Sequence, residues 1–204
     1  MIAIVDYGAS NLRSVQRALA RFGAEAAVTN SPEDVAAAEA VVLPGQGEFS
    51  SAMAGLARLG LDRAVVNAIQ AGKPYLGICI GLQVLFEEGE ERGLHKGLGL
   101  IEGRVARLNA PGLKIPHMGW NALEFEGDCP LFAGIDEGAH VYFVHSYACY
   151  PKDRGLVSAW STYGERFAAA VCRDNLHAVQ FHPEKSQRVG LDIIRNFVRI
   201  AGEE

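Results

Sequence analysis

Apolar residues in the first part of the chain alternate between short runs and positions spaced as in a helix. Four short apolar runs predict strands: residues 2–6, 26–29, 40–45 and 74–78. After the first run, apolar residues recur at helical spacing: Leu12, Val15, Leu19 and Phe22. Gly23 is a plausible helix stop, Ser31 is a plausible N-cap, and residues 49–71 predict further helices. Strands that alternate with helices predict a parallel sheet with helices on both faces.

The pattern changes between residues 98 and 182. Short β-rich segments alternate there with turns, which predicts an added antiparallel or mixed sheet region. A closing helix follows, with an inner face of apolar residues: Leu191, Ile194, Phe197, Val198 and Ala201. We therefore expect one α/β domain over residues 1–204, with an open, mostly parallel (mixed) sheet flanked by helices.

Composition narrows the range of functions. Of the 204 residues, 49% are hydrophobic and 21% are charged, and the net charge is −5. Proteins that bind a phosphate backbone usually have a concentrated basic face, so no nucleic-acid partner is expected. No apolar run reaches the roughly 18 residues of a membrane span. The first residues also lack the features of a signal peptide, so a cytoplasmic protein without membrane contact is expected.

The chain has four cysteines: Cys79, Cys129, Cys149 and Cys172. None forms a Cys-x-x-Cys pair, and the six histidines have no spacing typical of zinc sites. No metal site and no other cofactor is therefore expected. Disulfides are rare in a reducing cytoplasm, so buried, inert thiols are the default for all four. Only the first of them lies in a motif that suggests another role.

Residues 77–81 read Gly-Ile-Cys-Ile-Gly at the end of an apolar run. Where a strand turns abruptly into a helix, flanking glycines permit close approach, and the residue at the turn projects at the carboxyl edge of the sheet. The helix N-terminus favours a thiolate there. This pattern makes Cys79 a candidate nucleophile. The alternative is a buried cysteine in a glycine-rich strand end.

A base and an orienting carboxylate follow a later apolar strand, in residues 179–186. His182 can help to ionise Cys79 and can later protonate a leaving amine, while Glu184 holds the imidazole tautomer. Pro183 restricts the conformation of the residue before it. A surface turn after a strand is the alternative interpretation of this segment.

A third strand end is followed by the glycine-rich loop Leu-Pro-Gly-Gln-Gly-Glu-Phe, residues 43–49. Gly45 and Gly47, on either side of Gln46, allow the backbone to approach a ligand or to change conformation. Backbone N–H groups of this loop can share an oxyanion with the N–H of Ile80. The alternative is an ordinary loop. Three such elements at the carboxyl ends of strands predict a ligand site in an open α/β sheet.

These three elements, in this order, resemble the class I (triad) glutamine amidotransferases, and the likeness covers almost the whole chain. Four further segments are similar to the glutaminase subunits of imidazole glycerol phosphate synthases: residues 6–15, 116–121, 142–147 and 180–186. The resemblance implies a flavodoxin-like fold with an added antiparallel β region. The chain departs from the family pattern at Gln46, where many relatives have valine, and at Ser10, where a second glycine is common.

The resemblance also implies a reaction. Glutamine would be hydrolysed through a thioester on Cys79, and ammonia would pass to a (β/α)8 synthase partner in a heterodimer. That partner would make imidazole glycerol phosphate and an aminoimidazole carboxamide ribotide in histidine biosynthesis. The implied glutamine-binding residues are Gln83, Glu91, His145, Ser146 and Tyr147. The residues expected to face the partner are Asn11, Trp120, Tyr142 and Lys185.

Each of these assignments has a simpler alternative. Gln83 is expected to face the pocket from the helix after Cys79, but it also suits a solvated helix surface. Glu91, expected at the far end of that helix and opposite the substrate α-amino group, lies in an acidic run typical of a surface. Residues 140–147 suit a core strand, and Trp120 suits a core position.

Three rival functions share part of this pattern. The glutaminase of another pathway, such as anthranilate, carbamoyl phosphate or pyridoxal phosphate synthesis, would have the same catalytic residues. A cysteine hydrolase of γ-glutamyl bonds is the second rival. The third is an inactive, scaffolding relative, which intact Cys79, His182 and Glu184 disfavour.

Overall fold

The structure, a computed structural model, describes residues 1–202; residues 203–204 of the expected domain lie outside the described part. Five strands form its parallel half: β1 (Ile2–Val5), β2 (Ala26–Thr29), β3 (Ala40–Leu43), β4 (Tyr75–Ile78) and β14 (Leu176–Val179). Their order is β2-β1-β3-β4-β14, the flavodoxin-like order. The four strands predicted in the first part of the chain are confirmed. The carboxyl ends of β3, β4 and β14 consequently lie next to one another.

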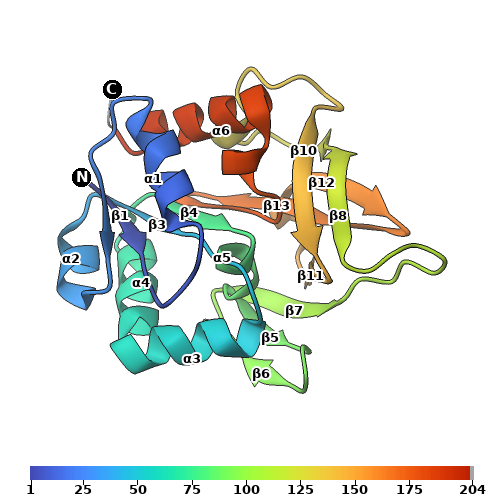
Figure 1. The fold of residues 1–204 in the computed structure, drawn as a ribbon, viewed down its shortest axis with the longest axis horizontal. Coiled ribbons are helices and arrows are strands. Elements are labelled where there is room, and N and C mark those ends of the chain that lie inside the picture. Colours follow the sequence, from blue (N-terminus) through green and yellow to red (C-terminus); the bar gives the residue numbers. More distant parts are fainter. Residues whose placement is uncertain (203–204) are drawn as a thin grey trace.

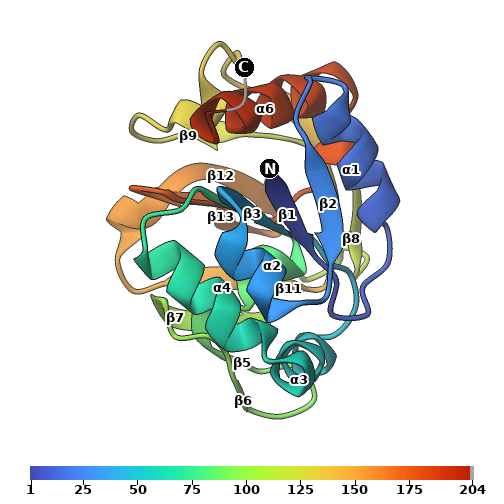
Figure 2. The same ribbon diagram turned by 90° about the vertical axis from the view of Figure 1, so that its left-hand side faces the viewer.

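Helices cover both faces of this sheet, as Figures 1 and 2 show. One face packs against α1 (Leu12–Ala20) and α6 (Gln187–Ile200). The other packs against α2 (Pro32–Ala37), α3 (Phe49–Leu59) and α4 (Leu61–Gln70). The apolar residues of each helix line one side, so each face of the sheet has its own hydrophobic core.

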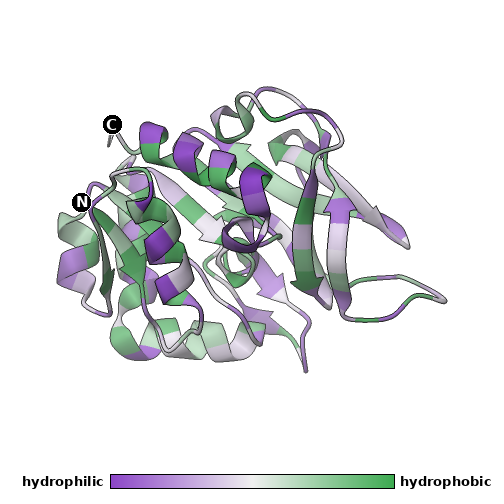
Figure 3. Cartoon of the chain, turned by 45° about the horizontal axis from the view of Figure 1, so that its top comes forward, coloured by the Kyte–Doolittle hydropathy of each residue, from purple (hydrophilic) through white to green (hydrophobic). Residues whose placement is uncertain are grey.

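The closing helix α6 alternates between hydrophilic and hydrophobic residues, which is visible in Figure 3. Its buried face includes Ile194, Phe197 and Val198, as the periodicity predicted. Leu191 is only partly buried, and Ile193, which the pattern did not select, is fully buried. The helical period was therefore correct, with the buried stripe rotated slightly from its expected position.

The β-rich part of the chain extends the same sheet beyond β14. The extending strands are β13 (Glu165–Arg173), β11 (Tyr147–Pro151), β7 (Ile101–Arg107), β5 (Phe86–Gly89) and β6 (His95–Lys96). Two more join it through β13: β12 (Val157–Tyr163) and β9 (Glu124–Phe125). Most of these pairings are antiparallel, and only β5–β7 is parallel. The predicted mixed region is confirmed.

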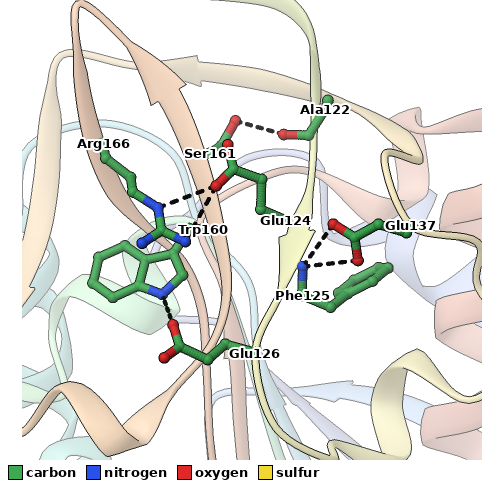
Figure 4. Close-up of polar contacts among 8 residues, drawn as sticks. All are labelled: Ala122, Glu124, Phe125, Glu126, Glu137, Trp160, Ser161 and Arg166. Carbon is green, nitrogen blue, oxygen red and sulfur yellow. Dashed lines mark hydrogen bonds and ion pairs between the residues drawn. The ribbon is translucent and has the colours of Figure 1, made fainter.

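Two strands form a separate antiparallel sheet: β8 (His117–Ala122) and β10 (His140–His145). Side-chain hydrogen bonds link β8 and β9 to neighbouring elements, as Figure 4 shows. Ser161 Oγ donates to the Ala122 carbonyl at 2.8 Å. Arg166 Nε donates to the Glu124 carboxylate at 3.2 Å, and the Glu137 carboxylate accepts from the β9 backbone. The Ser161 bond thereby ties β8 of the two-stranded sheet to β12 of the main sheet.

One predicted element is wrong. Glu91 was expected at the far end of the helix that follows Cys79, but that helix, α5 (Ile80–Gln83), has a single turn. The chain then enters β5, and Glu91 lies in the loop between β5 and β6. The reason is that Val84, Leu85 and Phe86 are all buried, and a continuous apolar run favours a strand covered on both faces over a one-sided helix.

No helix within residues 1–202 is both long enough and apolar enough to cross a membrane.

Candidate active site

Cys79 lies at a sharp turn between β4 and α5. Its backbone has φ 54° and ψ −102°, a strained conformation for a residue with a side chain, of order 1–3 kcal/mol. A Cβ on Gly77 would lie 2.4 Å from the Gly81 carbonyl oxygen, and a Cβ on Gly81 would lie 1.8 Å from that of Leu43. Only glycine therefore permits this packing of strand, turn and helix. The turn holds the thiol at the carboxyl edge of the sheet with 5% of the residue exposed.

His182 and Glu184 form a buried pair just after β14. The imidazole Nδ1 lies 2.9 Å from Glu184 Oε1, and both side chains are 1% exposed. A carboxylate accepts, so Nδ1 carries the hydrogen and the unprotonated position of a neutral ring would be Nε2. Nε2 is buried and has no hydrogen bond of standard geometry among the described residues. Asn11 Nδ2 also donates to Glu184 Oε1, at 2.6 Å.

The imidazole of His182 interacts with the Cys79 thiol. Burial by itself would lower the pKa of His182, but its interactions with Cys79 and then with Glu184 outweigh burial and raise the pKa to about 9. The imidazolium is therefore the dominant form near neutral pH. The imidazole therefore interacts with a thiol on one side and with a buried carboxylate on the other. Acyl-transfer chemistry by a cysteine requires this arrangement of nucleophile, base and orienting group.

We expect an NMR titration to show that His182 loses its proton near pH 9, and that Cys79→Ala lowers this pKa, because the thiol supplies its largest raising interaction. The sign follows from linkage. A folded-state pKa raised from 6.5 stabilises the folded protein below about pH 6.5, and this stabilisation is lost as the pH rises through about 9. Unfolding at several pH values should show that loss, reduced in Cys79→Ala. A measured pKa of about 6.5 for His182 in the wild-type protein would contradict this account.

A pocket of about 280 Å³ opens in front of Cys79. Its lining includes all five residues expected to bind glutamine: Gln83, Glu91, His145, Ser146 and Tyr147. Gln46, Gly47 and Ile80 also line it. A hollow of about 450 Å³ between α2 and α4 is larger, but it is lined by no cysteine or histidine. Of these two pockets, only the smaller one is lined by a cysteine and a histidine.

The loop after β3 contacts this pocket through Gln46 and Gly47. Gly47 has φ 110°, a conformation that favours glycine, and a Cβ on Gly45 would lie 1.8 Å from the Tyr7 hydroxyl oxygen. The structure therefore explains why glycine occupies both of these positions in the loop. The N–H groups of Ile80 and Gly81 begin α5 and have no acceptor earlier in that helix. They are available to an anion near the thiol.

Two pocket residues are held in fixed positions. Gln83 is buried, and its Nε2 donates to the Tyr147 carbonyl at 3.2 Å and to Gln180 Oε1 at 3.1 Å. Glu91 Oε2 accepts from the Phe49 N–H at 2.8 Å. Glu91 thus lines the pocket from a loop, although the helix expected to carry it is absent.

The segment 145–147 is fixed by two neutral histidines. The Tyr147 carbonyl can only accept, so His145 Nδ1 donates to it at 2.9 Å. His145 Nε2 then accepts from His117 Nδ1, which lies 3.0 Å away. Burial lowers the pKa of His145 to about 3 and that of His117 to about 4. Both rings are uncharged at neutral pH, so the histidine chain orients the pocket wall.

Sequence reasoning missed three residues beside the thiol or the pocket. Gln180 Nε2 lies 3.6 Å from Cys79 Sγ, and a lone polar residue in the apolar run before His182 was the available signal. His117 supports the pocket wall. Tyr7 has a buried hydroxyl without a hydrogen-bond partner in the described part of the chain, and burial, then Cys79, raise its pKa.

The four residues expected to face a partner lie near one another but differ in exposure. Trp120 is 45% exposed, and its ring centroid lies 6.1 Å from that of Tyr142 on the neighbouring strand. Lys185 is exposed and follows Glu184 directly in the chain. Asn11 is half-buried, and its side chain binds Glu184 instead of pointing only outward.

Comparison with known proteins gives consistent results. The family model "Glutamine amidotransferase class-I" matches residues 3–201. The chain is 50% identical to "Imidazole glycerol phosphate synthase subunit HisH" of Syntrophotalea carbinolica, over 97% of this chain and 98% of the relative. It is 49% identical to the protein of that name from Desulfitobacterium hafniense, over 100% and 96%.

A solved structure titled "Crystal structure of glutamine amidotransferase" superposes with a TM-score of 0.77 and 24% identity, covering 98% of both chains. At this identity it supports the fold alone. The family model and the curated relatives, which cover nearly the whole chain, establish more. The chain belongs to the class I glutamine amidotransferases, within the family of HisH subunits of imidazole glycerol phosphate synthase.

Proposed function

We propose that this chain hydrolyses glutamine on Cys79 and supplies the ammonia to a (β/α)8 partner that makes imidazole glycerol phosphate and an aminoimidazole carboxamide ribotide in histidine biosynthesis. The observation that carries the proposal is the thiol at the strand–helix turn beside the buried His182–Glu184 pair. The near full-length similarity to HisH subunits supports the choice of pathway over other glutaminases.

In the first half of the reaction, the sulfur of Cys79, whose proton has passed to His182, attacks the side-chain amide carbon of glutamine. The developing oxyanion accepts from the N–H of Ile80 and from the loop 45–47, where one donor is typically worth about 3 kcal/mol. The His182 imidazolium donates its Nε2 proton to the departing nitrogen, which leaves as ammonia. A γ-glutamyl thioester remains on the enzyme.

In the second half, His182 acts as the base that takes a proton from water. The resulting hydroxide attacks the thioester, glutamate leaves, and Cys79 and His182 again share the proton taken from water. Glu184 keeps Nδ1 protonated and stabilises the imidazolium through both steps. The Glu91 carboxylate, which lines the same pocket, suits the substrate α-ammonium group.

A partner surface is supported by exposed apolar residues on the two-stranded sheet, whose strands β8 and β10 lie side by side in Figure 1. Met118 is 64% exposed and Trp120 is 45% exposed, both on β8. The neighbouring strand is bonded to the catalytic segment. The Tyr142 carbonyl accepts from the His182 N–H at 2.9 Å, and the Tyr142 N–H donates to Ser186 Oγ at 2.9 Å. A partner seated on this sheet would therefore act directly on the backbone that holds His182.

Trp120→Ala should weaken binding of the synthase partner by about 30-fold, because a buried aromatic anchor at an interface is typically worth about 2 kcal/mol. Calorimetric titration of the two subunits measures this. The matched control is Leu94→Ala, a residue 68% exposed in the β5–β6 connection, away from β8. Equal weakening by both substitutions would argue against this surface.

Asn11→Ala should lower glutaminase kcat by about 10-fold or more with little change in KM. The reason is that Glu184 would lose a charge-assisted hydrogen bond worth about 1.5–3 kcal/mol, and the imidazole would be held less firmly. Asn11 is a positioning residue, so the NMR-measured pKa of His182 should also change. An unchanged pKa together with weaker partner binding would assign Asn11 to the interface alone.

The proposal is tested by measuring glutamate release from glutamine by the chain alone, with a candidate (β/α)8 synthase, and with the synthase and its nucleotide ligand. We expect the lowest rate for the chain alone and the highest for the liganded complex. Equal rates in all three conditions would refute control by the partner, with the loop 45–47 as its switch. No glutamate in any condition would overturn the proposed function, and fast release without a partner would favour a γ-glutamyl hydrolase.

A further inference from the structure

Three soft ligand groups meet at the end of the sheet remote from the thiol pocket. Cys172 on β13 and His177 on β14 are direct partners in the antiparallel register. Cys129 comes from the loop before the short 3-10 helix η1 (Pro130–Phe132). His177 Nδ1 lies 3.2 Å from Cys172 Sγ and 3.9 Å from Cys129 Sγ. All three ligand atoms lie within 4.8 Å of one another.

These separations match the edges of a tetrahedral metal site. With Zn–S bonds of about 2.3 Å and Zn–N bonds of about 2.0 Å, sulfur and nitrogen ligands are separated by roughly 3.5 Å, and two sulfurs by roughly 3.8 Å. The observed distances of 3.2 and 3.9 Å bracket the first value. A metal ion can therefore enter with side-chain shifts of a few tenths of an ångström.

The surroundings favour a cation. Asp128 lines the same pocket of about 450 Å³ as Cys129, and the charge of Asp174 acts on Cys172. The Arg173 guanidinium is engaged by the Leu100 carbonyl, to which it donates at 3.1 Å. Ser158, whose buried Oγ has no hydrogen-bond partner among residues 1–202, lines the same pocket as Cys129.

We propose that Cys129, Cys172 and His177 bind one zinc-like divalent ion, with water as the fourth ligand. The ion fastens the loop before η1 to the β13–β14 hairpin. The loop leads directly into η1, and Asn196 on α6 donates to the carbonyls of Leu131 in η1 and Ala133 just after it, at 3.0 and 2.9 Å. The site therefore stabilises the packing of α6 on the sheet. The spacing of the ligands gave no hint of it, since Cys129 and His177 are 48 residues apart.

The test uses the full chain with Cys79→Ala, kept reduced, so that the thiol of the glutaminase site cannot take up metal. Zinc is titrated in competition with a chelator, and cobalt(II) is added separately to report thiolate ligands by charge-transfer absorption. We expect one ion per chain and a rise in Tm of about 5 °C or more at saturation. Magnesium, which prefers oxygen ligands, should have no effect.

Cys129→Ser and His177→Gln should each weaken zinc binding at least 100-fold and remove the rise in Tm. The matched control is Cys149→Ala, whose thiol is buried and lies outside the cluster; it should bind zinc like its parent. Cys129 is half-buried, so its serine variant should fold, which circular dichroism checks. Zinc uptake that survives Cys129→Ser, or a reduced protein that takes up no zinc, would overturn the proposal.

Discussion

Cys79→Ala should abolish glutamine-dependent synthesis by the complex of this chain with its synthase, while synthesis from added ammonium salts continues at the wild-type rate. Removing the nucleophile of a catalytic triad lowers kcat by about 10⁶-fold. The effect on the partner should be absent because ammonia from solution needs no thiol. The Cys79 side chain is 5% exposed and small, so alanine removes the sulfur without a large cavity.

Both activities are measured on the same preparation, with glutamine or an ammonium salt as the nitrogen source. Cys149→Ala is the matched control, since it removes a second buried thiol that does not line the pocket, and it should retain both activities. A glutamine-analogue electrophile should label the wild type and this control but not Cys79→Ala. Loss of ammonia-dependent synthesis in an intact complex containing Cys79→Ala would refute the division of labour between the subunits.

Gly81→Ala should destabilise the protein by about 3 kcal/mol or more and lower glutaminase activity at least 100-fold. The added Cβ would lie 1.8 Å from the Leu43 carbonyl oxygen, and a backbone atom cannot move aside as the end of a side chain can. Overpacking of this kind typically costs about 1–3 kcal/mol and sometimes more. Relief of the clash must shift α5 or β3, and a displacement of about 1 Å at a reacting group can lower the rate 100-fold.

Chemical denaturation and glutamate release measure the two effects. Gly155→Ala is the control, because its Cβ would meet only the Asp153 side chain, at 3.2 Å, in an exposed turn. We expect a change within about 0.5 kcal/mol there. If Gly81→Ala were as stable and active as Gly155→Ala, the close approach of strand and helix would not be what requires glycine at this turn.

Much of the fold was predictable because it depends on neighbouring residues. The strands of the parallel half followed from short apolar runs, and the N-cap at Ser31 is present, with its Oγ accepting from the Asp34 N–H at 3.1 Å. The turn at Cys79 followed from its flanking glycines. The extent of α5 was not predictable in this way, since it is decided by the burial of residues 84–86 under other elements.

Residues that act through distant partners were hidden from sequence reasoning. Asn11 was expected on an outer surface, but it binds Glu184, which is 173 positions away in the chain. Gln180 and Gln83, which are 97 positions apart, hold each other beside the thiol. Neither contact leaves a local pattern, because hydrogen bonds between side chains require only that the strands and helices that carry them pack together.

The sequence by itself determined the alternation of strands and helices, the sharp turn at Cys79 and the His-Pro-Glu segment. Periodicity, glycine and proline act over a few residues, so each of these features is local. Only the tertiary structure decided which strand ends lie next to one another. The order of β3, β4 and β14 brings the loop, the thiol and the imidazole to one edge, and the β13–β14 hairpin brings Cys172 and His177 to Cys129. Such meetings depend on strand pairing and burial across the whole chain, so no single segment encodes them.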